Sequence, residues 1–307
     1  MGEGDVHPMT TTAQPPERVA ERLLRASAEH EWDADTALDW DTPLLEDAWY
    51  APPELLTLYG TDLWRRMDHR QRIALSRSEA AGLMNAGLWT ELILMQLLSR
   101  YVAGRDFADS RSRYALTEIG EEVRHSLMFS RAAERLDGGG HGTGVPWSRV
   151  LGVTTPALGR GPGAFAAILT VEEVNDYWQR EAMRDERVQP FIRQVCRLHV
   201  ADEARHLGFA RSELLRAVDG LPAPRLELHR ETAGIAMALV CSRHFTDPRI
   251  YRAVGLDPRE AQRQARRNPH HRHNLLRFGE KPVAFLTEAG MIGPRQRHWW
   301  RRAGLMP

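Results

Sequence analysis

The stretch that decides the fold of this chain is His199-Val-Ala-Asp-Glu203-Ala-Arg-His206. If it is helical, steps of four and three residues put His199, Glu203 and His206 within about 60° of one another on one face. Imidazole and carboxylate groups together suit iron or manganese. The stretch therefore predicts a helix that presents metal ligands to the interior of an all-α protein.

A related pattern lies upstream in Glu121-Glu122-Val-Arg-His125, where Glu122 and His125 are one helical step apart. Ferritin-like bundles hold a di-iron or di-manganese pair with Glu-x-x-His on two helices and one glutamate on each of two others. Two more glutamates are therefore expected on two further helices, and Glu91 and Glu172 are the candidates.

The spacing of these glutamates is the strongest argument for the site. Glu91 precedes Glu122 by 31 residues, and Glu172 precedes Glu203 by 31 residues. In each triple the histidine follows the second glutamate by three residues, so the whole triple recurs after 81 residues. Two helical hairpins with equal internal spacing can pack about a pseudo-twofold axis and bring both triples to one centre.

Adjacent carboxylates leave two assignments open on the residues alone. Glu121 competes with Glu122, and Glu173 competes with Glu172; only the repeated spacing favours Glu122 and Glu172. Glu91 follows Gly87-Leu-Trp-Thr and precedes Leu-Ile-Leu-Met, where a carboxylate is costly unless it is paired or bound to metal.

His199 adds a third histidine one turn before Glu203. It is either a ligand that makes the centre asymmetric or a core histidine with satisfied hydrogen bonds. Asp202 is expected to orient a ligand histidine rather than to bind metal, because such outer carboxylates are common. Gly82 and Gly87 either leave room beside the metals or permit close helix packing.

The rest of the chain also predicts an all-α bundle, because alternating strand patterns are scarce. An extended arm is expected near Trp40 to Pro53, and a tail of short helices at the C-terminus. The glycine- and proline-rich stretch from Asp137 to Gly163 predicts a long crossover between two halves. We expect a disordered segment at residues 1–15 and one ferritin-like domain over residues 16–307. Apolar residues recur at helical spacing, without internal proline, in five long segments: about 68–102, 114–136, 164–184, 190–220 and 223–245.

Composition excludes several classes of protein. Forty-one basic residues balance 41 acidic ones, which argues against a nucleic-acid binder with a general basic surface. Two cysteines cannot form a disulfide framework. No signal peptide is visible, and the most apolar stretch, around Ala233 to Cys241, is shorter than the roughly 20 residues of a membrane span. A cytoplasmic enzyme without a membrane partner is expected.

The motifs resemble the AurF family, the di-iron arylamine N-oxygenases named for p-aminobenzoate N-oxygenase. The likeness lies in the motifs around Glu91, Glu122, Glu172 and His199 and extends to Ala289-Gly-Met-Ile-Gly in the tail. It implies a ferritin-like bundle, two iron ions with manganese as an alternative, and O₂ as co-substrate. It also implies a homodimer. The ligands that it implies are Glu91, Glu122, His125, Glu172, His199, Glu203 and His206.

The resemblance implies oxidation of an aromatic amine to hydroxylamine, nitroso or nitro products in a biosynthetic pathway for natural products such as antibiotics. No flavin or nicotinamide motif is visible, so an external electron donor or reductase is expected. The alternatives are a di-iron C–H hydroxylase or other oxidase of a pathway intermediate and, third, a ferritin-like storage protein. Asn175 and Asp176 either contact substrate or solvate the end of the bundle.

Overall fold

The computed structural model describes residues 15–137 and 161–307. In these ranges every regular element is helical, apart from one isolated β-bridge. The expected all-α fold is confirmed. The expected disorder of residues 1–15 and the crossover loop lie almost wholly outside the described residues.

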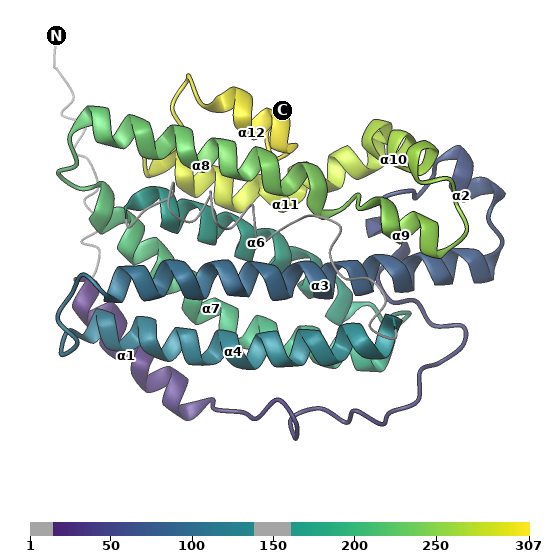
Figure 1. Ribbon diagram of the computed structural model, residues 1–307, viewed down its shortest axis with the longest axis horizontal. Coiled ribbons are helices and arrows are strands. Elements are labelled where there is room, and N and C mark those ends of the chain that lie inside the picture. The colour runs from purple at the N-terminus through teal and green to yellow at the C-terminus, as the bar shows by residue number, and fades with distance from the viewer. Residues whose placement is uncertain (1–14, 138–160) are drawn as a thin grey trace, which may run out of the picture.

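Two long hairpins form the centre of the bundle (Figure 1). The helix α3 (His69–Val102) packs along α4 (Ser110–Asp137), and α6 (Pro162–Arg184) packs along α7 (Pro190–Val218). All four were expected from the apolar spacing, with ends that differ by a few residues. The pairing matches the two equal halves inferred from the repeated triples.

Local chemistry explains where these helices begin and end. Asp68 caps α3 in a capping box with Gln71, in which each side chain accepts a hydrogen bond from the other residue's backbone amide. Pro162 and Pro190 occupy the first turns of α6 and α7, where no intrahelical amide bond is lost. After α7 the chain turns at Gly220, whose φ of 67° favours glycine.

The N-terminal segment wraps the hairpins. A helix that was not expected, α1 (Pro16–Glu29), packs on α4 and α7. The expected extended arm follows it, and Trp49 pairs with the turn between α6 and α7. Its amide donates to the Arg187 carbonyl at 2.9 Å, and its carbonyl accepts from the Gln189 amide at 2.7 Å. A 3₁₀ turn at Pro53–Leu55 and α2 (Asp62–Arg66) lead into α3.

The C-terminal part adds a layer beside α6 (Figure 1). It contains α8 (Ala223–His244), α9 (Pro248–Ala253), α10 (Pro258–Arg267), α11 (Pro269–Glu288) and α12 (Arg297–Ala303). The expectation of short helices is wrong for α11, which has 20 residues and continues through Pro282. Packing against α6 supports this helix despite the internal proline.

The helix α3 is longer and more apolar than expected from the sequence. By length and composition it could cross a membrane, whereas the most apolar stretch was expected around Ala233. Half of its most apolar window is buried inside the protein, and core helices of soluble proteins are often as long and apolar.

The glycines of α3 allow close packing. An added Cβ at Gly87 would lie 3.1 Å from the Phe129 ring, and one at Gly82 would lie 2.9 Å from Ile250.

Candidate metal centre

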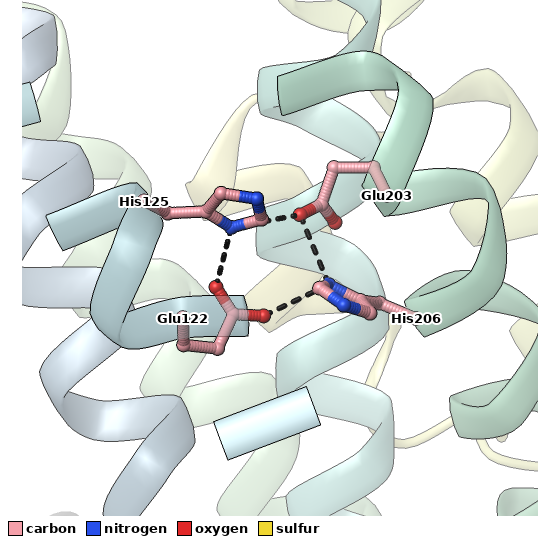
Figure 2. A group of neighbouring side chains, drawn as sticks. All are labelled: Glu122, His125, Glu203 and His206. Carbon is pink, nitrogen blue, oxygen red and sulfur yellow. Dashed lines mark hydrogen bonds and ion pairs between the residues drawn. The ribbon is translucent and has the colours of Figure 1, made fainter. Parts of the chain in front are cut away.

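Four side chains from two helices converge between the hairpins (Figure 2). Glu122 and His125 come from α4, and Glu203 and His206 come from α7. One oxygen of Glu122 lies 2.8 Å from His125 Nδ1, and the other lies 2.8 Å from His206 Nδ1. Glu203 Oε1 lies 3.2 Å from His206 Nδ1 and 3.8 Å from His125 Nδ1. Both Nδ1 atoms therefore face the two glutamates.

The other three expected ligands adjoin this group. His199 Nε2 lies 3.4 Å from Glu91 Oε1 of α3 and 3.4 Å from Glu203 Oε1. Glu172 of α6 lies beside His199 and Glu203, and the possible ligand atoms of these three residues are within 4.8 Å of one another. The structure thus brings together all seven residues expected from the sequence. Each is at most 2% exposed.

The adjacent carboxylates separate into an inner and an outer set. Glu122 faces the cluster, whereas Glu121 accepts from Arg205 at 2.9 Å. Glu172 faces the cluster, whereas Glu173 pairs with Arg211 of α7. The spacing argument therefore selected the inner member of both pairs.

Each outer carboxylate contacts a clustered histidine of the opposite hairpin. His125 Nε2 contacts Asp202 at 3.2 Å, and His206 Nε2 contacts Glu121 at 2.7 Å. An ionised carboxylate only accepts, so each Nε2 donates, and each Nδ1 faces the centre, where it can give a lone pair to a metal ion once it carries no proton. Asp202 orients a histidine, as expected, but the histidine belongs to the opposite hairpin.

Arg205 and Trp32 support this outer layer. The Arg205 guanidinium donates to Glu121 at 2.9 Å and to Asp202 at 2.6 Å. The Trp32 indole N–H donates to Asp202 at 2.8 Å, and its ring stacks on His125 with centroids 5.9 Å apart. One cation thus bridges the carboxylates that orient both histidines.

The buried charges shift one another's pKa values strongly. Burial, followed by repulsion from Glu122, raises the pKa of Glu91 well above its ordinary value. Burial and Glu203 do the same to the pKa of Glu172. Although burial opposes it, Glu122 raises the pKa of His125 to about 9. Burial lowers the pKa of His199 to about 4, so His199 is a neutral nitrogen donor at pH 7.

The residues fit a pair of metal ions. Four buried carboxylates crowd together, and one oxygen each of Glu91, Glu172 and Glu203 has no hydrogen-bond partner among the described residues. His199 Nδ1 is likewise unpartnered there. Buried charges without partners are costly, and divalent cations would neutralise them. Mixed carboxylate and imidazole donors suit iron or manganese, so the cluster fits a dimetal cofactor of either metal.

Sequence reasoning missed most of the outer layer. The 81-residue offset that relates the ligand triples also relates Glu121 to Asp202 and Arg124 to Arg205, so the repeat carried a signal for part of it. No sequence pattern marked Trp32. The clusters of possible metal ligands do not include Asn175 or Asp176, the two residues suggested as substrate contacts. The Asp176 carboxylate accepts a hydrogen bond from Arg180 at 2.6 Å.

Comparison with known proteins agrees with this geometry. Two uncharacterised proteins, from Mycobacterium bovis and Mycobacterium tuberculosis, are 25% identical over 292 residues, covering 91% of this chain and 84% of theirs. Two variants of an R2-like ligand-binding oxidase with a reconstituted Mn/Fe cofactor share the fold. Their TM-scores are 0.52 and 0.51 at 16% identity, covering 95% of this chain and 99% and 98% of theirs. The family model of p-aminobenzoate N-oxygenase AurF matches residues 13–290, and this chain therefore belongs to the AurF family.

Proposed function

We propose that this protein is a non-haem di-iron N-oxygenase that uses O₂ to oxidise a primary aromatic amine to a hydroxylamine, nitroso or nitro product. Membership of the AurF family and the buried carboxylate and histidine cluster support an oxygenase with a dimetal centre. The family description, p-aminobenzoate N-oxygenase, supports an aromatic amine as the substrate.

We assign seven residues as ligands, supported by their convergence: Glu91, Glu122, His125, Glu172, His199, Glu203 and His206. The observation that carries the assignment is the placement of His199. A neutral, buried histidine touches Glu91 and Glu203 and leaves a ring nitrogen unpartnered among the described residues. One half of the centre thus has an additional nitrogen donor, which a symmetric storage site does not need.

The chemistry divides between the metals and the chain. When bound, the metal pair would supply O₂ activation and the transfer of oxygen to the substrate. The chain supplies carboxylates and histidines at fixed positions, and Glu121 and Asp202 hold each Nε2–H so that each Nδ1 stays available. Burial of all seven side chains keeps bulk water away from the ligands. We propose an external reductase or reductant, because oxidation of an amine to a nitro group supplies six electrons, whereas the two O₂ molecules that deliver its two oxygens take up eight.

The decisive experiment is reconstitution with ferrous iron, followed by O₂, a reductant and a panel of arylamines, with products followed by mass spectrometry. We expect mass gains on the amine nitrogen and about two irons per chain. Hydroxylation of carbon without any N-oxidation would replace the proposal with a C–H hydroxylase. A protein that binds only one iron would overturn the ligand assignment.

The assembly and setting are also proposals. We propose a homodimer that works in the cytoplasm as one step of a biosynthetic pathway, following the usual habit of the family. Sedimentation of the purified chain should give twice the monomer mass of 34.9 kDa. A monomer at micromolar concentration would contradict the dimer and leave the metal-site assignment untouched.

A further inference from the structure

A cavity lies in the C-terminal layer, apart from the metal centre. Its volume is about 740 Å³, and it is enclosed mainly by α8, α11 and α12, which gather on one side of the bundle in Figure 1. None of its described lining residues belongs to the four helices that carry the metal ligands. The volume is that of a small-molecule site.

The floor of the cavity is apolar. This floor is made of aliphatic side chains of α8 and α11 together with Ala303 and Trp299 of α12. The indole N–H of Trp299 donates to Glu231 at 2.6 Å. A ligand with an apolar body would bury surface there and gain hydrophobic free energy. The apolar lining residues are Ile235, Ala238, Leu239, Leu275, Trp299 and Ala303.

Four arginines form the rim: Arg266, Arg272, Arg301 and Arg302. All four are exposed, and none makes an ion pair with a described residue. Arg272 and Arg301 use only Nε, which donates to the backbone oxygens of Arg266 and Pro307. The terminal guanidinium nitrogens are therefore available to a ligand. Guanidinium groups bind carboxylate and phosphate with paired hydrogen bonds.

No negative group balances this rim within the described lining. The lining contains no aspartate or glutamate. Burial lowers the pKa of His271 to about 4 and raises the pKa of Cys241 to about 12, so both are neutral at pH 7. The lining of the cavity therefore combines exposed positive charge with apolar side chains.

Two buried polar side chains of the lining are left incompletely bonded. His271 is 4% exposed and Thr246 is 6% exposed, yet His271 Nδ1 and Thr246 Oγ1 have no hydrogen-bond partner among the described residues. An unsatisfied buried polar atom costs about 1–3 kcal/mol. Polar atoms left unbonded beside a cavity are a recurrent feature of sites that bind a ligand or ordered water.

We propose that this cavity binds a small organic anion, with a carboxylate or phosphate head held by the arginine rim and an aromatic or aliphatic body in the apolar floor. The site is distinct from the metal centre and does not depend on the proposed oxygenase reaction.

Calorimetric titration with three related probes tests the proposal on the full-length protein. The probes are 2-naphthoate, 2-naphthyl phosphate and the neutral 2-naphthylmethanol, each titrated with and without added ferrous iron under anaerobic conditions. We expect one molecule of an anionic probe per chain, at least tenfold weaker binding of the neutral alcohol, and no dependence on iron. The tighter of the two anions identifies the head group.

Matched variants locate the binding. Arg301→Gln with Arg302→Gln removes two exposed rim charges and should weaken the anion at least tenfold. Arg252→Gln with Arg259→Gln removes the same charge from exposed positions outside the lining and should change affinity less than twofold. Ala238→Phe fills the floor and should also abolish binding, with circular dichroism as the check on folding.

Several results would overturn the proposal. The first is that neither anion binds. The second is that the neutral alcohol binds as tightly as the anions, and the third is that the anions bind only when iron is present. Equal loss of affinity in the rim pair and the control pair would also overturn it, because the effect would then be one of general charge.

Discussion

At the scale of single residues, His199 is the histidine that we propose as the additional nitrogen donor of the centre. Its Nε2 faces Glu91 and Glu203, and the Phe129 ring lies 4.8 Å from its own ring. A histidine kept neutral by burial can give a lone pair to a metal without first losing a proton. These contacts favour the ligand interpretation over a core histidine with satisfied hydrogen bonds.

His199→Ala should weaken binding of one metal by at least about tenfold and reduce turnover, while the free energy of unfolding measured in chelator falls by only about 1–2 kcal/mol. Metal analysis after iron loading and urea unfolding check the two effects. His271→Ala is the matched control, since His271 is also buried with an unpartnered Nδ1. The control should lose similar stability and keep its iron. Full iron content in His199→Ala would return this residue to a core role.

Arg205 holds together the carboxylates that orient both ligand histidines. Arg205→Met leaves Glu121 and Asp202 facing each other without a bridging cation, and removing one partner of a buried ionic group is strongly destabilising. We expect a loss of about 3 kcal/mol in the free energy of unfolding and about 10–100-fold weaker iron binding.

Arg124→Met is the control for Arg205→Met, because Arg124 occupies the equivalent position of the other repeat. It is 24% exposed and lies 3.8 Å from Glu121. Its loss should cost less than about 1 kcal/mol. Equal effects of the two variants in denaturant unfolding would show that Arg205 has no special bridging role.

At the scale of elements, the contact between α3 and α4 depends on small residues. Gly87 faces the Phe129 ring, and Phe129 in turn packs on His199. A side chain at residue 87 would push this ring toward the metal ligands. The interpretation of Gly82 and Gly87 as close-packing positions is therefore favoured over room for substrate.

Gly87→Leu should destabilise the protein by about 1–3 kcal/mol, because the added side chain overpacks the interface. Gly120→Leu on the exposed side of α4 should be neutral or stabilise by up to about 1 kcal/mol, since a Cβ there meets nothing and leucine favours helix. Urea unfolding of both variants checks the difference. A stable Gly87→Leu variant would show that the two helices separate easily.

Helices with long apolar patterns could be predicted from the sequence, whereas a helix with a short pattern could not. The long helices α3, α4, α6, α7 and α8 carry enough turns for the spacing to define them. The helix α1 was missed because its buried residues, such as Val19 and Leu23, form a stripe of few turns. Such a stripe becomes helical and buried through its packing on α4 and α7.

At the scale of the whole molecule, a buried carboxyl joins three distant parts of the chain. Glu79 of α3 accepts from the Thr57 hydroxyl at 2.6 Å, and that hydroxyl lies 2.9 Å from the Tyr251 hydroxyl of α9. Burial raises the pKa of Glu79 to about 7, although hydrogen bonds from Thr57 oppose the shift. The folded protein therefore holds this proton at pH values where the unfolded chain has released it.

The stabilisation from Glu79 is thus complete below pH 4.5 and is lost as the pH rises through about 7. The total change is about 3 kcal/mol. Glu79→Gln keeps an acceptor for Thr57 and should remove this contribution. The difference in unfolding free energy between pH 5 and pH 8, measured in chelator, should shrink by up to about 3 kcal/mol in the variant. An unchanged difference would show that Glu79 is ionised in the folded protein.

The sequence by itself determined the helical class and the candidate ligands, because helical periodicity fixes which side chains share a face. The repeated spacing then distinguished Glu122 from Glu121 and Glu172 from Glu173. Only the tertiary structure decided which carboxylate orients which histidine. Asp202 and Glu121 reach across to the opposite hairpin, and Arg205 and Trp32 join them there. Such contacts depend on how α4, α7 and the N-terminal segment pack, and no spacing within one helix specifies the packing of another.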